Sequence, residues 1–529
     1  MRKKNAAVVG AICALSTVFA GTAFAATANN VEQTISQDKQ GQQDSFLLKG
    51  IDVRPDGLLR KRPAGLDKVF DEFLGKQVTM NDLNALRDKI TSLYRQEGYS
   101  AATAYIPQQV ISGGYIKINV LDGELQAINI RNNAHIQDKI LAGKAALFKE
   151  GEVATSKKIE DVLYDINSID GVVATGELLP GTRTGSTVLN IYADKAKPYR
   201  GMLYVDNYGS KSTGKYNYGM LNNFYNIDGY GTNISIDGLV SNKNMVNYVF
   251  DVNTLVKPYL SKSRIGLSID RSSYELGNDF ADLDADGHAT TYKLYGKTSA
   301  YETMRHGLNY TYGFQFKDIH DKVGAFGLTT DKHAQSLFAT ISGHDRWKNR
   351  MVNFDFTATA GVHVNRSPYA IMLGQYNHSD GSFTKLEGNV NYYNMFDPRW
   401  TFKSNIKFQM LDKDIDSSEK MSMGGINGVR AYPSGEFSAD YGILTQNTLG
   451  YRTGDPNLTL GVFFDAANAT DKYSLGNKSL YGYGLEADYA KANDYFLQLT
   501  YARRIGLYDG ATKDAHSKDR VWFLAGKMF

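Results

Sequence analysis

The chain has 529 residues, 42% of them hydrophobic, and its 35 Tyr and 25 Phe stand against only 10 Pro. Its 59 basic and 56 acidic residues leave a formal net charge of +3, which gives no argument for a nucleic-acid partner. After residue 30, no apolar run approaches the ~20 residues of a membrane-spanning helix.

The first 25 residues have the pattern of a signal peptide. A basic start precedes a mostly apolar stretch from Ala6 to Ala20, and Ala23 and Ala25 form a small-x-small cleavage site. The alternative, a membrane anchor, lacks a positive far flank. The single cysteine, Cys13, lies inside this segment. The sequence therefore predicts an exported protein whose mature chain starts at Ala26 and is built without disulfides.

Residues 26–45 are polar and Gln-rich, and we expect a flexible segment there. Residues 46–122 predict a small α+β unit. "FLLKGIDV" has the composition of a strand, and "YIKINVLDGEL" alternates as another. Between them, apolar residues recur at helical spacing, with Thr79 as the expected N-cap and Gly98 as the stop.

Residues 123–197 repeat this order of elements. "LQAINIRN" predicts a strand, a helix is expected to begin after Thr155 or Ser156, and "TVLNIYA" alternates as the closing strand. The two units therefore indicate an internal repeat of about 75 residues. Neither contains a convincing catalytic constellation, so we expect adaptor domains.

From residue 198 to residue 529 the pattern changes to alternating segments of about ten residues, separated by Gly-, Asn- and Asp-rich turns. This is typical of a transmembrane β-barrel. In "NLTLGVFFDAA", Leu460 and Phe464 fall on one face and Phe463 and Asp465 on the other. The first face suits lipid and the second a wet lumen. Soluble sandwiches and propellers also alternate, but the export signal, the tyrosine content and the terminal Phe529 favour the membrane barrel.

Counting the segments predicts about sixteen antiparallel strands, an even number that returns both ends of the barrel to one side. Their expected starts are at about residues 200, 215, 230, 243, 262, 288, 305, 334, 350, 381, 398, 441, 456, 480, 494 and 519. Every odd-to-even connection would then be extracellular. The longest of them, at about residues 411–440, contains "GGINGVRAYPSGEF" and is called the lid loop below.

The lid-loop segment resembles the characteristic motif of two-partner secretion transporters, the TpsB group of the haemolysin secretion/activation and filamentous haemagglutinin transporter family. This group belongs to the superfamily of the BAM insertase. Its V-R-G-[FY] motif corresponds to Val429, Arg430, Ala431 and Tyr432, with Ala431 in place of Gly. The F-x-D-x-G motif of the same family corresponds to Phe463, Asp465 and Ala467, with Ala467 in place of Gly.

The two α+β units look like the POTRA domains of the same group. The matching residues are Gly98, Tyr99, Pro107, Gln108, Asp122 and Gly123 in the first unit and Leu179, Pro180 and Gly181 in the second. The resemblance implies POTRA 1 at 46–122, POTRA 2 at 123–197, and a periplasmic location before an outer-membrane barrel. Family members usually begin with a helix that plugs the barrel. About twenty residues after Ala26 leave little room for one in its usual form.

The resemblance also suggests where the site lies. A partly desolvated guanidinium needs a planar partner that accepts two hydrogen bonds, and Asp465 on the lumen wall supplies one. We therefore expect the lid loop to fold into the pore and to be held by an Arg430–Asp465 pair. The neighbouring motif residues that would shape it are Gly424, Gly425, Gly428, Val429, Ala431, Tyr432, Pro433 and Gly435. The alternative is a surface loop with a solvated arginine.

The function implied by the resemblance is export of a large secreted β-helical partner, an adhesin or haemolysin, across the bacterial outer membrane. Further implied partners are outer-membrane lipid and the barrel-assembly machinery, for which Phe529 would be the C-terminal signal. A BAM-like insertase and a porin with pore conductance are the alternatives. Two POTRA units rather than five count against the insertase, and a porin needs neither the units nor the lid motif.

No catalytic or cofactor motif is present in the sequence. The phosphate-binding G-x-x-x-x-G-K-[ST] loop, the H-E-x-x-H pair and the G-x-S-x-G elbow are all missing. "DLDADG", from Asp282 to Gly287, matches the start of a calcium loop. Lys293 stands where that loop needs a bidentate glutamate, so we expect an acidic extracellular turn. The sequence predicts no enzyme, no cofactor and no metal.

Overall fold

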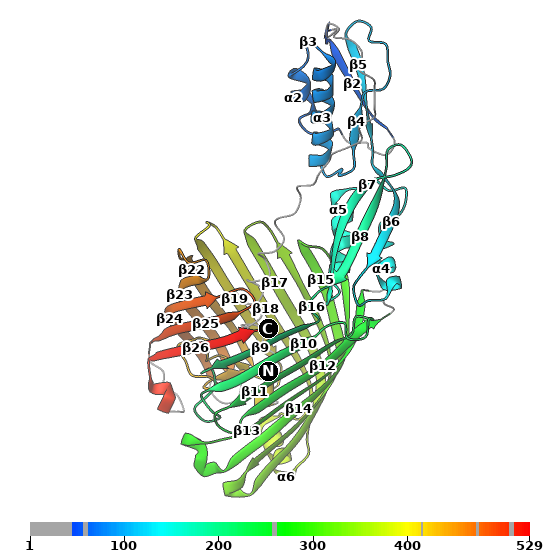
Figure 1. Cartoon of the computed structure of the whole chain (residues 1–529). Helices are drawn as coiled ribbons and strands as arrows, with labels where there is room; N and C mark the ends of the chain where they lie inside the picture. The colour runs from blue at the N-terminus through cyan, green and yellow to red at the C-terminus, as the bar shows by residue number, and fades with distance from the viewer. Residues whose placement is uncertain (1–44, 57–61, 257–261, 414–415, 472–475, 507–512) are drawn as a thin grey trace. The chain divides into compact units, whose positions relative to one another are not determined.

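The computed structural model describes residues 45–56, 62–256, 262–413, 416–471, 476–506 and 513–529. The predicted signal peptide and almost all of the predicted flexible segment lie outside these residues. The described chain divides into two compact units, one ending at Ala196 and one spanning Lys197–Phe529 (Figure 1).

The first part of the smaller unit is an α+β fold. Its three-stranded sheet has the order β2-β5-β4, with β2 parallel to β5 and β4 antiparallel to it. The elements are β1 (Phe46–Leu47), β2 (Gly50–Asp56), α2 (Leu66–Asp71), β3 (Gln77–Val78), α3 (Met80–Gln96), β4 (Thr103–Tyr105) and β5 (Tyr115–Leu121). The segment predicted as one strand from Phe46 is two strands, because β1 pairs with β3 before the chain turns and β2 pairs with β5.

Helix α3 begins and ends where its sequence predicts. The Thr79 hydroxyl accepts a hydrogen bond from the Asp82 N–H, and the Asp82 carboxylate accepts one from the Thr79 N–H at 2.8 Å, a complete capping box. Gly98 follows with a φ of 93°, the left-handed conformation that ends helices. Leu83, Leu86 and Ile90 face the sheet and are buried.

The second part of this unit has the same topology as the first. It consists of β6 (Glu124–Asn132), α4 (Asp138–Ala145), α5 (Ser156–Asn167), β7 (Val172–Pro180) and β8 (Ser186–Lys195). The sheet order is β6-β8-β7, with β6 parallel to β8 and β7 antiparallel to it. Thr155 is the N-cap of α5. Of the helices that the structure describes, none is both long and apolar enough to cross a membrane.

The larger unit is a closed antiparallel barrel of sixteen strands, which confirms the predicted number (Figure 1). The strands are β9 (Tyr199–Asp206), β10 (Asn217–Phe224), β11 (Asn233–Ser241), β12 (Val246–Val256), β13 (Ser263–Glu275), β14 (Ala285–Glu302), β15 (His306–Val323), β16 (Leu328–Arg346), β17 (Arg350–Asn365), β18 (Gly381–Met395), β19 (Trp400–Leu411), β22 (Tyr441–Arg452), β23 (Leu458–Asp471), β24 (Gly476–Ala490), β25 (Tyr495–Ile505) and β26 (Asp519–Met528). β26 pairs with β9 and closes the ring.

The two faces of the barrel strands follow the predicted alternation. On β23 the side chains of Leu460, Val462 and Phe464 are exposed on the outer surface, whereas Phe463 and Asp465 are buried on the inner one. β26 behaves in the same way, with Val521 outside and Trp522 inside. The outer face therefore suits lipid, and the inner face lines the lumen.

Several short elements between the strands were not predicted. Helix α6 (Pro368–Asn377) follows β17, and the Ser367 hydroxyl caps it with Pro at its first position, a start signal present in the sequence. The predicted acidic turn, Asp282 to Gly287, is instead the end of the 3₁₀ helix η2 (Asn278–Leu283) followed by the start of β14, and η3 (Gly324–Phe326) and η5 (Lys513–His516) are further short 3₁₀ helices. The lid loop contains η4 (Ser417–Glu419) and a two-residue ladder of β20 (Met421–Ser422) with β21 (Ser438–Ala439).

Candidate functional site

The lid loop lies folded against the inner wall of the barrel. Its apolar side chains form one buried cluster with residues of β22 to β25: Met421, Met423, Val429, Ala431, Tyr432, Phe437, Ala439, Leu444, Phe463, Ala467, Ala469, Leu480 and Ala502. A surface loop with a solvated arginine would leave these side chains in water. The buried cluster excludes that alternative.

Arg430 and Asp465 are brought together inside the barrel. The Arg430 Nε donates to Asp465 Oδ2 at 2.8 Å, and Nη2 donates to Oδ1 at 2.7 Å, a bidentate fork. The backbone N–H of Arg430 donates to Oδ2 as well, at 3.0 Å. Asp465 is fully buried. One carboxylate therefore fixes both the side chain and the backbone of the loop.

Two further polar partners of Arg430 were not predicted, whereas the motif residue Phe463 was. Its Nη1 donates to Glu486 Oε2 at 2.7 Å, and Nη2 also lies 3.3 Å from the Thr448 hydroxyl. The ring of Phe463 lies under the guanidinium at 3.6 Å from its centroid. The alternation on β24, where Tyr483 and Leu485 are exposed, placed Glu486 on the lumen side. This alternation could have been read from the sequence, but the pairing of Glu486 with Arg430 could not.

The lid loop also contacts both strands at the seam that closes the barrel. The Trp522 Nε1 of β26 donates to the Arg430 carbonyl at 2.7 Å. The Ser434 hydroxyl donates to the carbonyl of Tyr208, just after β9, at 2.7 Å. The Tyr208 and Trp522 rings meet edge to face at 6.2 Å. The lid tip thus contacts the last strand and the segment that directly follows the first.

Glycines let the lid backbone fold back on itself. A Cβ on Gly428 would lie 2.3 Å from the Met423 carbonyl oxygen, and one on Gly424 would lie 2.3 Å from that of Pro433. Gly425 and Gly435 have φ of 84° and 79°. At these positions a larger residue would displace the backbone or strain it.

The remaining predicted lid residues are buried beside Arg430. Val429, Ala431 and Tyr432 are buried, and the Arg504 guanidinium lies 5.8 Å from the centre of the Tyr432 ring. Pro433 is buried at the tip. On the wall, Ala467 is buried in the same apolar cluster as Phe463. These contacts make the lid a packed element rather than a tethered chain.

Phe529 lies apart from the lid. Its side chain is half exposed, its backbone N–H donates to the Gly201 carbonyl at 2.9 Å, and Lys527 lies 5.8 Å from its ring centre. The last residue therefore completes the ladder between β26 and β9.

The geometry defines a class of protein: a barrel whose lumen is occupied by its own loop, preceded by two small repeated α+β units. Residues 185–489, more than half of the chain, match the family described as haemolysin secretion/activation protein ShlB/FhaC/HecB. Residues 46–123 match the POTRA domain of ShlB type. The chain belongs to the ShlB/FhaC/HecB family, which confirms the predicted TpsB type.

Relatives agree with this assignment. The chain is 28% identical over 435 residues to the heme/hemopexin transporter protein HuxB of Haemophilus influenzae, covering 80% of this chain and 75% of the relative. It is 24% identical to the outer membrane transporter CdiB of Dickeya dadantii, with 83% and 78% covered. The solved structure of CdiB from Escherichia coli has the same fold, with a TM-score of 0.65 at 19% identity and coverage of 94% and 93%.

The protein is therefore an outer-membrane transporter of two-partner secretion with its POTRA region in the periplasm. It recognises an exported protein and passes it through the barrel to the cell surface. The family is one of transporters.

Proposed function

We propose that the lid loop is the gate of this export pore and that Arg430 holds it closed. The observation that carries the proposal is the single guanidinium bonded to both Asp465 and Glu486 inside the barrel wall. A buried charge network of this kind specifies one position of the loop more than it stabilises the fold. Export then requires the loop to leave this position or to shift within it.

We further propose that both α+β units are POTRA domains and that they bind the partner along a free strand edge. The second unit repeats the topology of the first, and its sheet leaves β6 and β7 at the edges. Main-chain bonds to an added strand hold an extended chain without reading its sequence, so specificity comes from nearby side chains. The partner is a large secreted protein of the adhesin or haemolysin class, with β-helical structure, and its folding outside the cell drives transport without a nucleotide, a cofactor or a catalytic step.

The competing functions fit less well. A BAM-like insertase has a related barrel: BamA from Haemophilus ducreyi has a TM-score of 0.57 at 12% identity, a likeness of fold alone. The described chain has two α+β units before its barrel rather than five. A porin would conduct through an open lumen, whereas here the lid loop packs against the inner wall.

Replacing Arg430 by Ala tests the gate. Because Arg430 gives the lid its one defined position inside the barrel, we expect its loss to abolish partner export from cells, while heat-modifiable migration in gels shows that the barrel still folds and inserts. Arg503→Ala is the matched control, because Arg503 pairs with Asp519 at an exposed position away from the lid. Unchanged export by a folded Arg430→Ala protein would overturn the proposal.

A further inference from the structure

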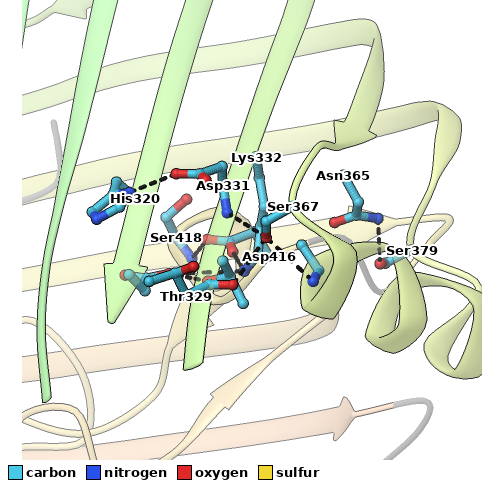
Figure 2. Close-up of polar contacts among 12 residues, drawn as sticks. His320, Thr329, Asp331, Lys332, Asn365, Ser367, Ser379, Asp416 and Ser418 are labelled. Carbon is cyan, nitrogen blue, oxygen red and sulfur yellow. Dashed lines mark hydrogen bonds and ion pairs between the residues drawn. The ribbon is translucent and has the colours of Figure 1, made fainter. Parts of the chain in front are cut away.

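The base of the lid loop carries a second set of ion pairs, separate from Arg430. Asp416 precedes η4, and its Oδ1 accepts a hydrogen bond from the Ser418 N–H at 2.9 Å. Its Oδ2 is 2.7 Å from the Lys332 Nζ of β16 (Figure 2). Asp416 is buried. One carboxylate therefore shapes the start of the lid and binds it to the wall.

Glu419 makes the larger part of this base contact. Its Oε1 pairs with Lys317 of β15, and its Oε2 lies 2.5 Å from the Lys385 Nζ of β18. The Gln409 side-chain amide donates to the Glu419 carbonyl at 2.9 Å. The Glu419 side chain is 5% exposed, and those of Lys317 and Lys385 are 14% and 10% exposed. These pairs are shielded from water, so they are screened far less than surface pairs.

The two sets of ion pairs hold the lid to different sides of the barrel. Counting round the ring from β9, the lysines come from the seventh, eighth and tenth strands, β15, β16 and β18. The carboxylates that bind Arg430 come from the thirteenth and fourteenth, β23 and β24. The positions of the two sets differ by three to seven strands in a ring of sixteen, so the two sets hold the lid to separate parts of the wall.

Between these attachments the lid is hydrogen-bonded as one body. The Met423 N–H donates to the Phe437 carbonyl at 2.8 Å, and the Val429 N–H donates to the Met423 carbonyl at 2.7 Å. The Gly425 N–H donates to the carbonyl of Tyr432 at 2.9 Å. A loop with this internal bonding moves as a unit. Displacing one end of the lid therefore strains the ion pairs that hold the other end.

We propose that Asp416 and Glu419 are positioning residues that form a second latch of the gate, and that the lumen clears only when this latch and the Arg430 contacts are both broken. The inference rests on the proposed function of the lid as gate. In it, the lid is held to the barrel wall at two separate places, and the lysines of β15, β16 and β18 form the second of them.

The test compares channel opening in planar bilayers for the full-length protein and its variants. The combined variant Asp416→Asn with Glu419→Gln keeps the shape of both side chains and removes their charges. We expect its open fraction to rise about tenfold or more, as for the loss of a charged hydrogen bond. When this variant is combined with Arg430→Ala, the fold-changes in open fraction of the two should multiply, because clearing the pore requires both sets of contacts to break. Asp519→Asn, which removes an exposed carboxylate from its Arg503 pair, is the control and should leave the open fraction unchanged.

A second comparison separates latching from a general loss of stability. Lys385→Met should raise the open fraction of the parent protein. In a Glu419→Gln background it should raise the open fraction by no more than about twofold, since the Glu419 carboxylate that Lys385 pairs with is already gone. Full multiplication of those two effects would overturn the latch. If Asp416→Asn with Glu419→Gln leaves opening unchanged while Arg430→Ala raises it, the second latch is refuted and the gate stands. If all of these variants stay closed, the gate itself is refuted.

Discussion

Arg430→Lys keeps the charge at the lid and removes only the guanidinium geometry. In the parent, Arg430 satisfies Asp465 through two nitrogens and Glu486 through a third, and lies on the Phe463 ring. A lysine ammonium is a compact charge that cannot bind a carboxylate as a planar fork and reach a second carboxylate in the same geometry. At least one of the two buried carboxylates therefore loses a donor.

The size of the effect follows from the hydrogen bonds that the substitution removes. A hydrogen bond to a charged group contributes about 1.5–3 kcal/mol, so removing one while keeping the charge should weaken the closed lid by about 1.5–3 kcal/mol. This corresponds to roughly 10- to 150-fold in the open-to-closed ratio. Arg430→Ala leaves Asp465 and Glu486 without the guanidinium, and breaking a buried ion pair in this way costs about 3–5 kcal/mol.

The assay uses Val429→Cys as a reporter, because Val429 is fully buried in the closed lid and Cys13 lies within the predicted signal peptide. Reaction with a membrane-impermeant maleimide then measures the fraction of time that the lid is away from the wall. Labelling should accelerate in the order parent, Arg430→Lys, Arg430→Ala, with Arg503→Lys equal to the parent. A labelling rate within twofold of the parent for both Arg430 variants would refute the reasoning.

Two further predictions concern backbone contact and helix capping. Gly482→Ala should raise the labelling rate of Val429→Cys, because the added Cβ would lie 2.7 Å from the Ala431 Cβ. Gly454→Ala is the control, since a Cβ there meets open space and should leave the rate unchanged. Equal rates for the two variants would contradict the close packing of lid and wall. Thr79→Ala should lower the free energy of unfolding of the periplasmic fragment at neutral pH by about 1 kcal/mol, measured by urea denaturation. Hydrogen bonds from the Thr79 N–H and hydroxyl lower the pKa of Asp82 below 3.8 in the folded protein. The ionised carboxylate therefore stabilises the fold at pH values above its unfolded pKa. This stability is lost as the pH falls through the lowered folded pKa. The deficit of Thr79→Ala should therefore shrink in acid, and a deficit that does not change with pH would count against the capping box.

The strands of the barrel were predictable because alternation is a local property. Each predicted start lies within six residues of the observed one, the largest difference being β16, expected at about 334 and beginning at Leu328. β16 and its neighbours are much longer than a bilayer requires, so hydrophobicity alone does not mark their outer ends. Helix α6 was missed for a related reason, since its ten residues are too few for a clear helical period.

The site was predictable in part. The pattern of the lid loop and the lumen-facing position of Asp465 together indicated an Arg430–Asp465 pair, and the structure contains it. Glu486, Trp522 and Glu419 were missed, although all three are charged or aromatic residues on the inner side of the barrel or in the lid. Glu486 and Trp522 lie 56 and 92 residues from their partner Arg430, and Glu419 lies more than 30 residues from its partner Lys385. No local pattern encodes such distances.

The sequence by itself determined the repeated α+β units, the number of strands and which side chains face lipid or lumen, because these follow from periods of 3.6 and 2 residues and from capping and turn residues. The tertiary structure decided where the lid lies and what holds it. Ring closure brings β26 beside β9, and the lid then reaches β15, β16 and β18 at one end and β23 and β24 at the other. A residue's neighbour across a lumen depends on the strand count, the register and the path of the whole loop together, so only the closed barrel specifies it.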